Sequence, residues 1–342
     1  MKMKQLTAGM IALVMSMSLP MTTYAADWDL EKGSITVNAD NSGQTVTQGS
    51  DPAVSDDAPV ITQRDSSAET SNTITINTSE NATANVTISN VNINASNNTG
   101  SESKAAVSTS GQGNVNIELD GTNSLKSGRE HAGLEKSKDG KLTITDENGN
   151  GKLIATGGDY GAGIGGGSKG NGSNITITGG EVTATGGIGA SGIGGGNLGG
   201  GNNITITGGK VTATGGMFAS GIGGGSFKDG NDITITGGKV TATGGIGASG
   251  IGGGDKGNGS NITITGGEVT AAGGTNGAGI GGGLQKNGEK ITVSGDATIK
   301  VQGGPTNKCD GAGAGIGNGG SHNGAYNSWS LTPVNGAETE PD

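Results

Sequence analysis

A unit of 29 residues repeats along this chain from Asn174 to Ile291, four times in full with a fifth copy beginning. The landmark Gly-Ile-Gly-Gly-Gly recurs at the same interval, beginning at Gly163, Gly192, Gly221, Gly250 and Gly279. A unit this short cannot bury its own apolar face and has to stack on its neighbours. The repeat therefore predicts an elongated solenoid in which every outward residue becomes part of a column.

Two segments of each copy alternate apolar and polar residues, which is the pattern of half-buried β-strands. In the first copy they are Ile-Thr-Ile-Thr at 175–178 and Val-Thr-Ala-Thr at 182–185. Paired glycines at 179–180 and 186–187 permit sharp corners, and a third short strand carries Ile193. Three short strands per 29-residue coil describe a parallel β-helix, so the expected fold class is all-β.

A similar spacing of strands extends to both sides of the regular copies. Upstream, core-facing strands are expected to start at Val86, Val115, Leu142 and Ile175. The intervals between these starts are 29, 27 and 33 residues, and the last is long because residues 146–152 enlarge one corner. A final, looser coil is expected around Ile291, Ile299 and Ile316. About eight coils are therefore predicted from Val86 onward.

The chain divides into five segments by composition. Residues 1–25 resemble a signal peptide, with Lys2 and Lys4 before an apolar run and a small-x-Ala site ending at Ala25. Residues 26–72 are expected to cap the N-terminal edge, 73–156 to form irregular coils and 157–320 the regular coils. Residues 321–342 are expected to be a C-terminal cap or tail. The sequence therefore predicts a secreted protein. It leaves open whether the protein associates with the cell surface and what its oligomeric state is.

Composition narrows the class of partner. The formal net charge of −10 becomes −12 once Lys2 and Lys4 leave with the signal, which argues against nucleic acid and anionic membranes. No later segment is long and apolar enough to span a membrane. Seventy-five glycines and seven aromatic residues exclude an ordinary globular core, and the single Cys309 excludes an intrachain disulfide.

The upstream strands carry a family resemblance. The segments Val86-Thr-Ile-Ser-Asn-Val-Asn-Ile93, Val115-Asn-Ile117, Leu142-Thr-Ile144 and Lys152-Leu-Ile-Ala-Thr156 resemble secreted clostridial carbohydrate-binding β-helix proteins. The resemblance covers about Asn85 to Gly320. It implies a right-handed helix of the polysaccharide-lyase type, polysaccharide binding without catalysis, and bound calcium in some members. It transfers no calcium ligand to a particular residue.

Two aromatic residues are candidate carbohydrate-stacking residues. Tyr160 and Phe218 each lie four residues before the Ile of the landmark, so they belong to one column two coils apart. Gly189 occupies the intervening coil and is expected to leave the space between the rings clear. Two coils span roughly 9–10 Å, about two sugar rings. The alternative is that these rings only pack against loops.

The enlarged corner is a weak candidate calcium site. Asp146, Asn148 and Asn150 match the first half of an oxygen-ligand loop, Asp-x-Asn-x-Asn-Gly. The Glu expected at the twelfth position is missing, because Gly157 stands there. The alternative is a tight polar corner between two strands. Calcium is the one cofactor considered.

Outward threonines should form flat Thr-x-Thr arrays, which some ice-binding proteins present. One column contains Thr176, Thr205, Thr234, Thr263 and Thr292. The simpler interpretation is that β-branched Thr suits a solvated strand face. A second outward column, Glu181, Lys210, Lys239 and Glu268, is expected to support the register through weak ion pairs.

Catalysis is not expected. His131 and His322 are the only histidines, and Cys309 has no assigned base. The leading hypothesis is a secreted, non-enzymatic polysaccharide-binding β-helix, with a plant or microbial cell wall as the suspected partner. A structural or adhesive surface rod without a sugar ligand is the alternative, and ice binding is a distant third.

Overall fold

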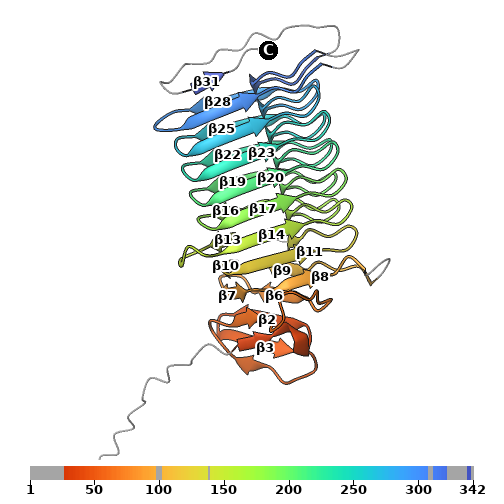
Figure 1. Cartoon of the computed structure of the whole chain (residues 1–342), viewed down its shortest axis with the longest axis vertical. Helices are drawn as coiled ribbons and strands as arrows, with labels where there is room; N and C mark the ends of the chain where they lie inside the picture. The colour runs from red at the N-terminus through yellow and green to blue at the C-terminus, as the bar shows by residue number, and fades with distance from the viewer. Residues whose placement is uncertain (1–26, 98–101, 138, 307–310, 322–336, 340–342) are drawn as a thin grey trace, which may run out of the picture.

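Each strand of the repeat pairs with its copy in the next coil, so the chain winds into a parallel β-solenoid in this computed structural model. The structure describes residues 27–97, 102–137, 139–306, 311–321 and 337–339. The predicted signal peptide, Cys309 and His322 lie outside these ranges. The coils stack along the long axis, with the N-terminal strands at one end and β28 near the other (Figure 1).

Three sheets run along the stack. Sheet A contains, in spatial order, β1 (Asp27–Asp29), β5 (Val60–Thr62), β7 (Thr83–Ser89), β10 (Asn114–Asp120), β13 (Leu142–Thr145), β16 (Ile175–Ile177), β19 (Gly201–Ile206), β22 (Gly230–Ile235), β25 (Gly259–Ile264) and β28 (Gly288–Val293). Sheet B contains β4 (Val54–Ser55), β3 (Gly43–Gln48), β2 (Ile35–Asp40), β6 (Ile74–Thr78), β9 (Val107–Gly111), β12 (Leu134–Lys136), β15 (Ile164–Gly165), β18 (Ile193–Gly194), β21 (Ile222–Gly223), β24 (Ile251–Gly252), β27 (Ile280–Gly281) and β30 (Ile316–Gly317). Sheet C contains β8 (Asn92–Asn94), β11 (Thr122–Lys126), β14 (Lys152–Thr156), β17 (Glu181–Thr185), β20 (Lys210–Thr214), β23 (Lys239–Thr243), β26 (Glu268–Ala272), β29 (Thr298–Gln302) and β31 (Ala337–Thr339). The eight strands of sheet A from β7 to β28 confirm the eight coils predicted from Val86 onward.

The strand register confirms most of the predicted spacing. Ile175 pairs with Ile204 at the regular step of 29 residues, and Leu142 pairs with Ile175 across the expected 33. Leu153 then pairs with Val182, a step of 29 again, so the extra residues lie in the corner between β13 and β14. The final coil is also confirmed, through pairs that involve Ile291, Ile299 and Ile316.

One predicted interval is wrong. Val115 pairs with Ala84 and Ile117 pairs with Val86, so the step between these coils is 31 residues and not 29. A shift of two residues keeps the same side chains facing the core. The alternation of apolar and polar residues therefore could not distinguish the two registers.

The core is a thin column of small aliphatic side chains. In the coil of β19 to β21, the side chains of Ile204, Ile206, Val211, Ala213 and Ile222 are fully buried. These residues recur in every regular coil, and they join one continuous apolar cluster that begins at Leu30. The repeat thus buries in the stack what one copy could not bury alone.

The N-terminal end is closed by antiparallel strands and by glutamine side chains. β3 pairs antiparallel with both β2 and β4, which ends the parallel stacking of sheet B. Gln44 is buried, and its amide donates to the carbonyl of Asp56 (2.9 Å) while its oxygen accepts the N–H of Asn85 (3.0 Å). These contacts satisfy backbone groups that a further coil would otherwise pair.

Regular backbone outside the sheets is scarce. The described ranges contain one short 3-10 helix, η1 (Leu30–Lys32). They contain no helix that is long and apolar enough to cross a membrane.

Candidate functional site

Two glycine-rich loops flank each of the short strands β15, β18, β21, β24 and β27 of sheet B, and their stacked tips form one edge of the rod (Figure 1). We call this surface the loop edge. Its first loops are residues 157–162, 186–191, 215–220, 244–249 and 273–278, and its second loops are 166–171, 195–200, 224–229, 253–258 and 282–287. Backbone hydrogen bonds join the two kinds of loop, because the N–H of Ser226 donates to the carbonyl of Gly189 (2.8 Å) and that of Asp255 to Phe218 (2.9 Å). The loop edge is therefore a single hydrogen-bonded surface.

One residue in each loop adopts a left-handed backbone conformation. The first loops place there Tyr160 (φ 73°), Gly189 (φ 74°), Phe218 (φ 71°), Gly247 (φ 75°) and Asn276 (φ 65°). The second loops place there Lys169 (φ 60°), Leu198 (φ 61°), Phe227 (φ 62°), Lys256 (φ 54°) and Gln285 (φ 60°). This conformation costs a side-chain-bearing residue about 1–2 kcal/mol. Bulky residues at these positions are therefore unusual.

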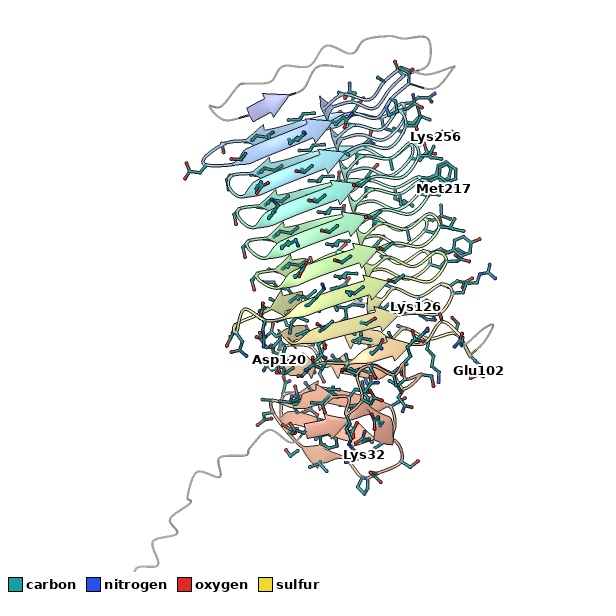
Figure 2. The ribbon with its side chains drawn as sticks, viewed as in Figure 1. Lys32, Glu102, Asp120, Lys126, Met217 and Lys256 are labelled. Atoms are coloured by element: carbon teal, nitrogen blue, oxygen red, sulfur yellow. The ribbon has the colours of Figure 1, made fainter. Side chains whose placement is uncertain are left out.

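Exposed apolar side chains gather on the loop edge. Seven large hydrophobic side chains are exposed in the described part of the chain, and six of them lie in these loops. They are Ile188, Leu198, Met217, Phe218, Phe227 and Ile246. Figure 2 shows Met217 and Lys256 at the outer tips of the stacked loops. Among the described residues, Val54 is the only exposed large hydrophobic residue outside these loops, and such a cluster is typical of an interaction surface.

The structure places both predicted stacking residues on the loop edge. Tyr160 and Phe218 occupy the same column two coils apart, but their role in carbohydrate binding stays a prediction. Phe218 is 36% exposed, and the guanidinium carbon of Arg129 lies 5.3 Å from the centre of the Tyr160 ring. Tyr160 is therefore held by a cation–π contact.

The predicted clear space at Gly189 is wrong. The Oδ1 atom of Asn197, in the second loop of the same coil, lies 2.5 Å from the position that a Cβ atom on Gly189 would occupy. The glycine is required because a polar side chain from the neighbouring loop fills the space beside it. The space beside Gly189 is thus filled by a polar side chain, whereas Ile188 and Leu198 of the same coil are exposed.

Phe227 is a further exposed aromatic residue on the loop edge, which the sequence did not single out. It is 54% exposed, and the ammonium nitrogen of Lys256 lies 5.9 Å from its ring centre. Leu198 and Lys256 occupy the same position in the adjacent coils, so the 29-residue spacing could have identified this second column. What the spacing could not show is that the two columns share one edge.

The backbone of Asp255 is hydrogen-bonded to the backbones of both Phe218 and Phe227. Its N–H donates to the carbonyl of Phe218, and its own carbonyl accepts the N–H of Phe227 (2.8 Å). Its side chain is buried, and Oδ1 has no hydrogen-bond partner. Burial raises the pKa of this carboxyl, and attraction to Lys256 opposes the rise. Asn197 occupies the equivalent position two coils earlier without a charge.

We expect Asp255→Asn to stabilise the fold at neutral pH by about 1 kcal/mol, because an unpaired buried charge is replaced by a neutral amide. The raised pKa means that the folded state holds this proton more tightly than the unfolded state. The stability penalty of ionisation therefore grows as pH rises above the ordinary value of 3.8. Unfolding midpoints at pH 4 and pH 7 should show a larger gain at pH 7. A lower midpoint for the variant at pH 7 would contradict this.

The calcium candidates form a hydrogen-bonded corner between β13 and β14. Oδ1 of Asp146 accepts the N–H groups of Gly149 (2.9 Å) and Gly151 (3.1 Å). The Asn150 amide donates to Asp120 (2.9 Å), and Asn148 is exposed. Among the described residues, no group of three or more His, Cys, Asp or Glu side chains is placed to hold a metal ion. A calcium role for Asp146, Asn148 and Asn150 stays a prediction.

His131 forms an ion pair in the irregular coil before the regular repeats. Its Nδ1 atom lies 2.9 Å from Oε2 of Glu135, which also accepts the N–H of Ala132 (3.0 Å). The hydrogen bond with Glu135 raises the pKa of His131, and the charges of Glu135 and Glu130 act in the same direction against desolvation. The ion pair thus joins two residues of the same coil, four positions apart in the chain.

We expect stability to fall as pH rises through the titration of His131. The contribution of the protonated ring is fully present below the ordinary pKa of 6.5 and is lost as pH passes the raised folded value. Thermal unfolding from pH 5.5 to 8.5 should show this decline in the wild type. His131→Gln and Glu135→Gln should each flatten it, and an unchanged slope in both variants would exclude the pair as its source.

The family of beta helix repeats matches five segments of the chain, namely 148–168, 175–197, 204–226, 233–255 and 262–284. These segments are similar to that family and agree with the observed solenoid. No curated protein and no solved structure matches the chain.

Proposed function

We propose that this chain is a secreted, non-enzymatic protein that binds polysaccharide along its loop edge. The observation that carries the proposal is the exposure of Phe218 and Phe227 on left-handed backbone. Glycine is the low-cost residue there, and Gly189 and Gly247 occupy the equivalent position of the adjacent first loops. Strained bulky residues that do not fill the core are a mark of function.

Aromatic rings suit this role for two reasons. Their faces stack on the apolar face of a sugar, and they supply a large contact area with few rotatable bonds. The solenoid holds successive rings on a hydrogen-bonded backbone, so little conformational entropy is lost when an extended polymer binds.

An adhesive or structural rod without a sugar ligand is the second candidate. Ion pairs along sheet C favour it, because they stabilise the stack itself. Glu181 contacts both Lys152 (3.6 Å) and Lys210 (2.8 Å), and Lys239 contacts Glu268 (2.7 Å). These exposed pairs confirm the predicted charge column and are individually weak.

Retention on insoluble polysaccharides separates the two candidates. The folded protein should sediment with at least one of cellulose, chitin, xylan or insoluble β-1,3-glucan, and Phe218→Gly should reduce retention. If the protein unfolds normally but is retained on none of them, the adhesive or structural rod is the remaining candidate. The same assay in EGTA, followed by added calcium, tests calcium: reversible loss of binding or of thermal stability would establish the ion.

A further inference from the structure

The loop edge alternates between two kinds of coil. At the left-handed position of the first loops, Tyr160, Phe218 and Asn276 alternate with Gly189 and Gly247. Eight residues later in each coil, the corresponding residues are Ser168, Ser226 and Leu284, alternating with Asn197 and Asp255. An aromatic residue is thus paired with serine, and glycine is paired with Asn or Asp.

The pairing has a steric cause. In the glycine coils, Oδ1 of Asn197 lies 2.5 Å, and Oδ1 of Asp255 lies 2.4 Å, from the ideal Cβ positions of Gly189 and Gly247. Real Cβ contacts are not this short, so a side chain at the glycine and the longer polar side chain opposite exclude each other. In the four coils that begin with the loops at 157, 186, 215 and 244, this place therefore holds either a ring or a longer polar side chain, whereas the next coil pairs Asn276 with Leu284.

We infer that the loop edge binds its polymer with a period of two coils. Two coils correspond to roughly 9–10 Å along the rod, so rings at Tyr160 and Phe218 would contact every second sugar. The intervening sugar would face the coil of Gly189, where Asn197 is polar and Ile188 and Leu198 are exposed. Asn197 and Asp255 are then specificity-determining residues, because they exclude rings from the intervening coils. This inference rests on the proposed polysaccharide binding.

The period selects a class of polymer. In a linear chain whose successive sugars are flipped, as in β-1,4-linked glucan, the same face recurs at every second residue. Such a chain, laid parallel to the rod, presents equivalent apolar faces to Tyr160 and Phe218. A coiled β-1,3-linked chain does not keep that alignment. The expected ligand is therefore an extended polysaccharide with a two-residue repeat.

The decisive variant adds a ring to the intervening coil. In Gly189→Phe/Asn197→Ser, the new ring enters a backbone with φ 74°, close to the 71° that Phe218 adopts, and serine replaces the obstructing side chain. If contacts alternate, the new ring pushes the intervening sugar away from the loop edge, so the chain can no longer contact both Tyr160 and Phe218. Affinity then falls about tenfold, the effect of one lost aromatic contact. If the loop edge is a uniform apolar strip, the added ring strengthens binding. Asn197→Ser alone is the matched control and should stay within about threefold of the wild type.

Titration calorimetry with cellohexaose and chitohexaose as probes, and laminarihexaose as the coiled comparison, measures this. The wild type should bind the first two more tightly, and affinity should rise sharply from cellobiose to cellotriose, the shortest chain that reaches both rings. This length dependence tests the inference even if the double variant does not fold. Tighter or unchanged binding by the variant, or no step at the trisaccharide, overturns the two-coil period alone. Absence of wild-type binding to every hexasaccharide and to the insoluble polysaccharides overturns the proposed function as well.

Discussion

Gly199→Ala should severely destabilise the solenoid, whereas the neighbouring Gly200→Ala should be close to neutral. A Cβ atom on Gly199 would lie 1.9 Å from the carbonyl oxygen of Gly170 in the adjacent coil. That oxygen also accepts the N–H of Gly196 (3.0 Å), so it cannot move without breaking a hydrogen bond between coils. Overpacking together with the lost hydrogen bond should lower the free energy of unfolding by about 3 kcal/mol or more.

Gly200 provides the matched control because it adjoins Gly199 in the same loop. The nearest atom to its hypothetical Cβ is the side-chain amide nitrogen of Asn202, at 3.3 Å, and the next is a carbonyl oxygen at 3.5 Å. Alanine at this position should change stability by no more than about 0.5 kcal/mol. Urea unfolding of both variants, followed by circular dichroism, makes the comparison. Equal midpoints would show that the coils can separate locally without cost.

The double variant Phe218→Gly/Phe227→Gln should lose polysaccharide binding while it keeps its stability. Glycine at 218 relieves about 1–2 kcal/mol of left-handed strain, but the gain is offset by greater freedom in the unfolded chain and by lost ring contacts. Glutamine is already accepted at the equivalent Gln285. We therefore expect the free energy of unfolding to change by less than about 1 kcal/mol. Each lost ring should weaken binding about tenfold, and both together about a hundredfold.

An exposed apolar residue away from the loop edge serves as the control. Val54 on β4 is 52% exposed at the N-terminal end, and Val54→Thr should leave binding unchanged. Retention on the polysaccharide that the wild type prefers, with melting temperatures for all three proteins, is the measurement. Loss of stability parallel to the loss of binding would mean that the rings are structural. Full retention of binding by the double variant would place the ligand elsewhere.

The architecture could be predicted from the sequence because it depends on periodicity. Alternation within Ile175–Ile177 identified strands, glycine pairs identified corners, and the 29-residue interval determined which residues stack. Those signals are local and repeat many times, so they reinforce one another. Where the repeat is imperfect, the register failed by two residues, as at Val86, because a shift of two preserves the inward face.

The binding surface could be predicted only in part. The column of Tyr160 and Phe218 follows from spacing, whereas the filled space at Gly189 depends on Asn197, eight residues away in a separate loop. Likewise, nothing local in the sequence shows that Phe227 shares an edge with Phe218. The backbone of Asp255 joins them through hydrogen bonds from the following coil.

The sequence alone thus determined that this chain must stack, how long each regular coil is and which side chains enter the core. The first two properties follow from the 29-residue interval of the regular copies, and the third follows from the alternation that a single strand already specifies. The tertiary structure decided which outward columns become neighbours, because adjacency between loops depends on how two corners fold back on each other. Figure 2 shows the result, with loop tips from separate parts of each repeat gathered on one edge of the rod.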